Sequence, residues 1–174
     1  MYPHHFKGEG QFVAKFQDKR VPEQTRIKEG KSNLNKEQKQ LWEDFAKKHL
    51  KTRLDGLLQV FGDNLYLLPK GLPDLSKVKI ARNGLHLGVF KKKRFEPSFA
   101  LGIALTSDEV VSSIELSQDQ FAQYVSGNVV TLDHTHPNGW YQLLVDGNGF
   151  GFAKVVGNTV KNYYPNVLSF TLKE

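Results

Sequence analysis

Cysteine is absent from this 174-residue chain. The absence excludes a disulfide framework, metal sites built on thiolates and any reaction that needs a cysteine nucleophile. It is also typical of proteins in a reducing compartment, so we expect a cytoplasmic location.

Long apolar segments are missing as well. No run of the sequence approaches the roughly 20 apolar residues that a membrane-spanning helix needs. The N-terminus lacks the charged segment followed by an apolar segment that marks a secretory signal. We therefore expect no membrane partner, and the length is compatible with one domain or two small ones.

Acidic residues are scarce where basic residues are dense. The chain has a formal net charge of +6 and a sequence pI near 9.4. Between residues 70 and 94 Asp74 is the one acid among eight basic side chains, whereas residues 107–122 hold four acids and no lysine or arginine. This segregation favours a polyanionic partner for the basic part. The eight basic residues are Lys70, Lys77, Lys79, Arg82, Lys91, Lys92, Lys93 and Arg94.

The first part of the chain alternates between patterned and unpatterned segments. Residues 12–16 alternate apolar with other side chains, which predicts a strand, and the polar residues 18–35 are typical of a linker. A capping box that begins at Asn35 predicts a helix over 36–50. Two short apolar runs on either side of Gly62 predict a hairpin.

Asn83-Gly84 is the strongest two-residue turn signal in the chain, and it predicts a second hairpin. In that register KVKIAR pairs with LHLGVF, and cross-strand partners share a face of the sheet. The predicted apolar face holds Val78, Ile80, Leu85, Leu87 and Val89, with Arg82 at its end. The predicted basic face holds Lys77, Lys79, His86 and Phe90 and leads into Lys91, Lys92, Lys93 and Arg94.

The second part of the chain predicts two short helices and then strands. Pro97 suits the first turn of a helix over 97–105, and a capping box at Ser117 predicts another helix that ends at the next glycine. NVVTL, WYQLLV and FGFAKVV then predict strands separated by the turns HTHPNG and DGNG. We expect an α+β fold in which a small α/β intermediate domain with hairpins (36–112) precedes a compact β-barrel (113–174).

Four stretches of the chain share their order and approximate spacing with one known family. They are PHHFKGEGQFVAKF, the segment from NLYLLP to GLHLG, RFEPSFALGIAL, and Lys154 followed by KNYYP. The set resembles the C-terminal region of bacterial Sun-type RNA cytosine methyltransferases. The resemblance implies that the barrel is a PUA-like RNA-binding domain. It also implies that residues 1–17 are a remnant of the last strand of a methyltransferase domain that this chain lacks.

Catalysis by this chain is not expected. The reaction that the resemblance implies, methylation of cytosine at carbon 5, requires a cysteine thiolate that adds at carbon 6. This chain has no cysteine, and its GEG and DGNG glycines precede or join strands, whereas a cofactor loop lies between a strand and a helix. We therefore expect no catalytic residue and no cofactor here, with S-adenosylmethionine bound in the methyltransferase domain.

Basic side chains around the second predicted hairpin form the first candidate RNA site. Cations on such a face contact phosphates and give salt-dependent affinity that does not depend on base sequence. The alternative is a solvated face whose lysines keep the sheet soluble. The candidate residues are Lys77, Lys79, His86, Lys91, Lys92, Lys93 and Arg94.

The KNYYP motif forms the second candidate. Lys161 suits a phosphate, Asn162 suits hydrogen bonds, and Tyr163 or Tyr164 suits stacking on an unpaired base. The alternative is that the tyrosines pack inside the barrel. After Pro165 the chain continues as NVLSF where the family pattern has a basic, glycine-containing end, so a terminal cationic contact is in doubt.

Lys154 is the third candidate. Strict alternation in FGFAKVV places it on the same face as Phe150 and Phe152. Either a bulge turns Lys154 out of the core, or the face of small residues packs inward and leaves two rings beside the lysine as a stacking platform. Trp42 and Trp140 are expected in the core.

His134 and His136 form an H-x-H pair. No third ligand lies nearby in the sequence, and no cysteine is present to complete a zinc site. We therefore expect a polar turn before Pro137 and no metal. His4 and His5 are likewise attributed to the family's motif and not to a metal site.

Two functions compete. In the first, the chain is an extension that binds RNA and positions it for the methyltransferase domain, and the resemblance implies ribosomal RNA more often than transfer RNA. In the second, it is an interaction or structural module that packs on the methyltransferase domain or on a ribosomal protein. The two differ in how strongly RNA binding depends on salt. In either case we expect a monomer.

Overall fold

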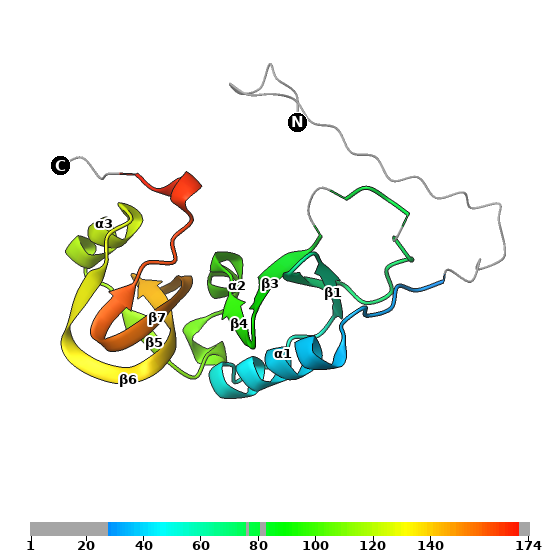
Figure 1. Cartoon of the computed structure of the whole chain (residues 1–174). Coiled ribbons are helices and arrows are strands. Elements are labelled where there is room, and N and C mark those ends of the chain that lie inside the picture. Colours follow the sequence, from blue (N-terminus) through cyan, green and yellow to red (C-terminus); the bar gives the residue numbers. More distant parts are fainter. Residues whose placement is uncertain (1–27, 76, 81–82, 171–174) are drawn as a thin grey trace, which may run out of the picture.

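The structure consists of two units that lie side by side, with helix α2 (Phe99–Ala104) between them (Figure 1). Its mixture of helices and sheets confirms the predicted α+β class. This computed structural model describes residues 28–75, 77–80 and 83–170. The predicted strand at 12–16, residues 18–27 of the predicted linker and Arg82 lie outside the described residues.

The first unit packs helix α1 (Lys36–His49) against an antiparallel sheet of four strands. The Asn35 side chain accepts a hydrogen bond from the Gln38 amide at 2.8 Å, and the Gln38 side chain accepts one from the Asn35 amide at 3.0 Å. These reciprocal bonds confirm the predicted capping box. The strand order is β1-β2-β3-β4, with β1 at Leu57–Phe61, β2 at Asn64–Leu68, β3 at Leu85–Lys91 and β4 at Arg94–Pro97.

Aromatic rings fill the space between α1 and the sheet. Trp42 and Phe45 are both buried, and their ring centroids lie 5.3 and 5.1 Å from that of Phe95 in β4. Inclined ring contacts of this kind add to the free energy of hydrophobic burial. Trp42 is therefore a core residue, as predicted.

The described end of the predicted linker is attached to the edge strand β1. The Asn33 side chain donates to the Val60 carbonyl at 2.9 Å and accepts from the Val60 amide at 2.7 Å. Glu29 also forms an antiparallel bridge with Pro73. Residues 28–35 thus pack along the first unit, while the domain boundary at residue 36 stays a prediction.

The predicted hairpins have different outcomes. The hairpin around Gly62 is confirmed, because Phe61 pairs with Asn64 across a two-residue turn. The hairpin at Asn83-Gly84 is wrong: residues 77–80 form no strand, and β3 pairs with β2 on one side and β4 on the other. Both edges of β3 are therefore occupied, so the local turn signal is overridden by tertiary pairing.

The predicted faces of this hairpin are consequently wrong. The pairing of β2 with β3 shifts between Leu65 and Tyr66, which leaves Leu87 as an extra residue in β3. Such a bulge changes which side chains share a face. Leu87 and Phe90 are both buried in the core, so Phe90 does not lie on a basic surface, and Val78 of the predicted apolar face is 57% exposed.

Helix α2 begins later than predicted. Pro97 is the last residue of β4, and the helix is capped by Ser98, whose side chain accepts a hydrogen bond from the Leu101 amide at 3.0 Å. The side-chain oxygen of Ser98 stabilises the first turn of the helix by accepting this bond. Pro97 has no side-chain oxygen and cannot act as such a cap. A short 3-10 helix at Ser107–Glu109 then leads into the second unit.

The second unit contains a sheet of three strands in the order β5-β6-β7. Helix α3 starts after the predicted capping box at Ser117 and is followed by Gly127, whose φ of 85° suits a helix end. In the described part of the chain this sheet does not close into a barrel. The elements are β5 (Ser113–Glu115), α3 (Gln118–Val125), β6 (Val130–Val145), β7 (Asn148–Lys161) and a 3-10 helix at Asn166–Leu168.

Strands β6 and β7 form one long antiparallel ribbon, which is curled in Figure 1. Their connection at Asp146-Gly147 has φ values of 50° and 75°, which confirms the predicted DGNG turn. The predicted turn HTHPNG is wrong, because these residues lie within β6. The pairing with β7 shifts on both sides of His136, so this polar sequence is held as bulges of a bent strand.

The two units meet in a close-packed seam. A Cβ atom on Gly102 of α2 would lie 2.3 Å from the backbone of Gly151 in β7, so glycine is required for this approach. The buried Gln142 side chain donates hydrogen bonds to the Gly102 and Leu105 carbonyls at 2.8 and 2.6 Å, which satisfies the end of α2. Phe152 packs into the core of the first unit. None of the helices in the described ranges has the length and apolar composition needed to span a bilayer.

Candidate nucleic-acid interface

The turn between β3 and β4 concentrates positive charge, and we call Lys91, Lys92, Lys93 and Arg94 the basic turn. Lys91 pairs with Arg94, which makes Lys92 and Lys93 the two residues of a tight turn. All four residues are exposed. Lys93 has a φ of 56°, a conformation that costs a side-chain-bearing residue about 1 kcal/mol.

The lysines of the basic turn are not neutralised. Arg94 pairs with Glu96 at 2.8 Å, but Lys91, Lys92 and Lys93 form no ion pair with any described residue. They line one side of a cleft of about 530 Å³. The rest of that cleft is lined by Asn35, Glu37, Gln38, Leu41, Asp63 and Phe90. Exposed cations beside an open cleft are suited to phosphate groups.

Lys77, Lys79 and His86 do not join the basic turn as predicted. Lys77 and Lys79 lie in the connection between β2 and β3, which enters β3 at the end opposite to the basic turn. His86 is half-buried, and its ring centroid lies 5.0 Å from that of Tyr66. Burial lowers the pKa of His86, and a hydrogen bond to the Gly88 carbonyl offsets part of this effect. Burial therefore disfavours the charged form of His86, which makes this side chain poorly suited to a phosphate.

Asn162 connects parts of the second unit. Its side-chain amide donates to the carbonyls of Tyr124 and Asn128 at 2.6 and 2.8 Å, and its oxygen accepts from the Tyr164 amide at 2.9 Å. A side chain with three such bonds is occupied by the fold. The prediction that Asn162 contacts RNA would require these bonds to break.

Tyr164 lies inside an aromatic cluster. Its ring stacks on Phe150 at 5.6 Å and makes edge contacts with Phe99 at 5.3 Å and Tyr124 at 6.2 Å. Burial raises the pKa of Tyr124 to about 12. The packing alternative therefore applies to Tyr164, while Lys161 at the end of β7 is exposed and unpaired with any described acid.

Tyr163 points to the seam and remains accessible. It is 36% exposed, and its ring centroid lies 4.8 Å from that of the half-buried Trp140. Burial raises the pKa of Tyr163, the charge of Glu96 raises it further and Arg94 lowers it, so the hydroxyl lies in the field of the Arg94–Glu96 pair. The tertiary structure thus places a side chain of the KNYYP motif beside the basic turn.

Lys154 is turned outward next to this ring pair. It is exposed and directly opposite Trp140 in the ladder between β6 and β7. The small residues Ala153 and Val155 pack inward, as one of the two predicted arrangements has it. However, Phe152 is only 3% exposed and Phe150 is covered by other rings, so these two do not form a stacking platform.

Trp140 is the residue whose exposure the sequence did not indicate. It packs against the core of the first unit, as expected, yet it retains accessible surface at the seam. Behind it, burial and the charge of Lys48 lower the pKa of His49 to about 4, although a hydrogen bond to the Trp140 backbone acts in the opposite direction. The sequence pattern of β6 cannot show how far Trp140 is buried, because the neighbouring residue His49 belongs to α1.

The histidine pair lies in the irregular part of β6. The ring centroid of His136 lies 5.8 Å from that of Tyr141. Among the described residues, no three histidine, aspartate or glutamate side chains are grouped closely enough to hold a metal ion.

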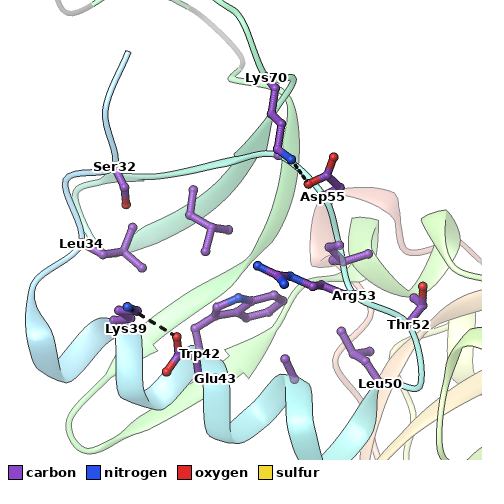
Figure 2. Close-up of a pocket in the computed structure, with 14 residues that line it drawn as sticks. Ser32, Leu34, Lys39, Trp42, Glu43, Leu50, Thr52, Arg53, Asp55 and Lys70 are labelled. Atoms are coloured by element: carbon purple, nitrogen blue, oxygen red, sulfur yellow. Dashed lines mark ion pairs between the residues drawn. The ribbon is translucent and has the colours of Figure 1, made fainter. Parts of the chain in front are cut away.

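A further cleft lies between α1 and the strands of the first unit, and we call it the α1 cleft (Figure 2). Its volume is about 650 Å³. Glu43 pairs with Lys39 and Asp55 pairs with Lys70, while the Arg53 guanidinium points toward Trp42. The carboxylates are thus engaged in ion pairs, and apolar side chains provide much of the remaining lining: Leu34, Trp42, Ala46, Leu50, Leu54 and Leu58.

Comparison with known families gives two matches that cover both units. Residues 44–105 match the first C-terminal domain of RsmF rRNA methyltransferase. Residues 111–169 match the PUA domain of methyltransferase RsmF. The boundary between the matches falls at the connection between the two units.

Two similar curated proteins come from bacteria. The chain is 27% identical over 176 aligned residues to a ribosomal RNA small subunit methyltransferase F of Erwinia tasmaniensis, and 28% identical over 181 to one of Shewanella halifaxensis. In both cases the alignment covers 97% of this chain but only 37% and 36% of the relative. The two domain matches and these relatives together show that the chain belongs to the Sun-type rRNA methyltransferase family and corresponds to the C-terminal region of its members.

Proposed function

We propose that this chain binds ribosomal RNA, in preference to transfer RNA, and positions it for a methyltransferase domain that modifies cytosine at carbon 5. The similar proteins are named as small-subunit ribosomal RNA methyltransferases, which supports this substrate class. An extension that holds the substrate accelerates the reaction by orienting it. The protein acts as a cytoplasmic monomer in this proposal, and the second unit has the role of a PUA-like barrel.

Methyl transfer itself is assigned to another domain. This chain contains no cysteine to attack the cytosine ring. Its glycine-containing turn at Asp146-Gly147 joins two antiparallel strands, which does not fit the loop that would hold S-adenosylmethionine. The proposed contribution of the chain is therefore binding and orientation.

The observation that carries the proposal is the state of the basic turn. Three neighbouring lysines are exposed without an acidic partner among the described residues, and Lys93 occupies an unfavourable backbone conformation. A solvated turn has no need of a lysine at a position that glycine would fill at lower cost. The presence of three lysines in this turn is explained by a ligand that carries several negative charges.

The test is a triple variant in which Lys91, Lys92 and Lys93 are changed to alanine. Binding of structured ribosomal RNA is measured at several salt concentrations. Each phosphate contact contributes about 0.7 to 0.9 to the slope of log affinity against log salt, so the slope should flatten by about two to three units. The matched control changes Lys47, Lys48 and Lys51, which lie at the other end of α1 and are also exposed.

The control should lose much less of the slope than the triple variant. Equal slopes for the two variants would mean that net charge, and not the basic turn, is responsible. An unchanged slope in the triple variant would remove the basic turn from the site.

The α1 cleft supports a second candidate function. Its apolar lining and the two ion pairs at its rim are better suited to a protein segment than to a polyanion. In this alternative the chain is an interaction module that packs on the methyltransferase domain or on a ribosomal protein. Two results would favour this alternative. The chain would bind no RNA at low salt, and it would bind the methyltransferase domain or a ribosomal protein in a way that Leu34→Asp abolishes.

A further inference from the structure

The seam between the two units exposes a pair of aromatic rings. Tyr163 follows β7 and Trp140 lies in β6, and their planes are inclined by 63° at a centroid distance of 4.8 Å. In an inclined pair the edge of one ring meets the face of the other, so the two rings do not cover each other's faces completely. Tyr163 is 36% exposed, and its hydroxyl has no hydrogen-bond partner in the described ranges.

Cations from both units flank these rings. Lys154 is opposite Trp140 in the ladder of β6 and β7, so their side chains share the outer face of that sheet. Arg94 and Glu96 come from β4 of the first unit, and both charges act on the Tyr163 hydroxyl. Arg94 uses its Nε to bond Glu96 at 2.8 Å, which leaves the outer nitrogens of the guanidinium for a ligand.

We propose that the seam holds one unpaired nucleotide, with its base stacked on Tyr163 and Trp140 and its phosphate contacted by Lys154 and Arg94. The inference rests on the proposed function, because it assigns a second contact to the same RNA. It adds a chemical requirement, since the site needs a base face that is not covered by neighbouring bases.

The chemistry at the seam favours an unpaired nucleotide over duplex RNA. A duplex presents phosphates and groove edges, and the basic turn is sufficient for phosphates. Aromatic rings are useful only where a base is unstacked, because every base then offers a π-face. Both rings and Lys154 come from the second unit, whereas Arg94 comes from the first, so the close approach of Gly102 to Gly151 holds the two parts of the site in register.

The experiment measures binding of the full chain to a single-stranded oligoadenylate of about eight nucleotides and to an RNA duplex of about twelve base pairs. Tyr163→Ala should weaken binding of the single strand roughly 5- to 100-fold, which corresponds to the loss of one stacked base, and should change duplex binding less than about twofold. Tyr163→Phe keeps the ring and should bind both RNAs within about twofold of the unaltered chain.

A spectroscopic signal reports the contact directly. Trp42 is only 6% exposed, so quenching of indole fluorescence by the single strand should come from Trp140. The quenching should be absent with the duplex. Phe170→Ala is the matched control, because this ring is 46% exposed and its segment lies beside α3, away from the first unit (Figure 1).

The outcomes separate this inference from the proposed function. Equal single-strand affinities for Tyr163→Ala and Phe170→Ala, or equal quenching by both RNAs, would overturn the seam site even if the basic turn retains its salt-dependent role. If Tyr163→Ala folds poorly, Tyr163→Leu preserves apolar packing on Trp140 without a π-face and must show the same selective loss. If Tyr163→Ala loses single-strand binding while the lysine triple variant binds RNA with an unchanged salt slope, the seam site is supported and the basic turn is rejected.

Discussion

The basic turn and the segment Lys161–Tyr164 were both predicted to contact RNA, but their side chains have different environments. The lysines of the turn are exposed and unpaired within the described structure, whereas Asn162 makes three hydrogen bonds and Tyr164 is surrounded by rings. Tyr163 is intermediate, since one side of its ring contacts Trp140 and the rest is accessible. Residue type therefore indicates which groups are able to bind RNA, and burial decides which of them are free to do so.

The largest expected effect tests the buried half of this comparison. Asn162→Ala should lower the free energy of unfolding by about 2 to 4 kcal/mol, because it removes three hydrogen bonds and leaves the Asn128 carbonyl without this donor. Chemical denaturation measures the change. The adjacent Lys161→Ala is the control and should stay within about 0.5 kcal/mol of the unaltered chain. Similar losses for both variants would show that Asn162 is not a structural residue.

Acid provides a second, smaller test of the buried region, at His49 behind Trp140. The native pKa is about 4 and the ordinary value is 6.5, so below pH 6.5 the unfolded chain binds a proton that the native chain does not. Stability should therefore be complete above pH 6.5 and fall by about 2 to 3 kcal/mol as the pH drops to 4.

His49→Phe keeps an apolar ring against Phe45 and should remove this part of the pH dependence. Denaturation curves at a series of pH values measure it. A native chain whose His49 titrates near pH 6.5 by NMR would contradict the burial assigned to this side chain.

The smallest effect concerns the exposed half of the comparison. Lys93→Gly should raise the free energy of unfolding by about 1 kcal/mol, because glycine adopts a φ of 56° without steric cost. The same variant should reduce the salt slope of RNA binding by about one unit. Opposite changes in stability and binding at one residue would be the signature of a functional turn.

Lys92→Gly is the control for this variant, because Lys92 has no positive φ and its replacement only adds freedom to the unfolded chain. It should lower stability by about 0.5 to 1 kcal/mol while reducing the salt slope to a similar extent. A gain of stability in both variants would mean that the backbone of the whole turn is strained.

The accuracy of the sequence predictions depended on the range of the interactions involved. The capping boxes at Asn35 and Ser117 and the tight turns at Gly62 and Gly147 were predicted correctly, because each depends on bonds between residues only a few positions apart. The hairpin at Asn83-Gly84 carried an equally strong local signal but was wrong. Its partner strand β2 lies earlier in the chain and competes for the same edge of β3.

The candidate site shows the same division. Exposure of Lys91, Lys92 and Lys93 followed from their charge, so the sequence was sufficient to find them, although the turn that they form was not predicted. The functions of Asn162 and Tyr164 could not be separated from that of Tyr163, because alternation along a strand does not extend into the irregular segment after β7. Trp140 was expected in the core, and its exposed edge depends on how closely the first unit approaches.

The sequence by itself determined the absence of thiol chemistry, the position of the positive charge and the local elements, because composition and short-range hydrogen bonds do not depend on distant residues. Only the tertiary structure decided the partners of β3, the burial of Phe152 and Phe90, and the contact of Tyr163 with Trp140, which lies opposite Lys154. Strand pairing and burial are settled by competition among all the surfaces of the chain, and a one-residue shift in register reverses the face on which a side chain lies. That competition is why aromatic residues close together in the sequence, such as Tyr163 and Tyr164, end in different environments, one accessible and one packed among other rings.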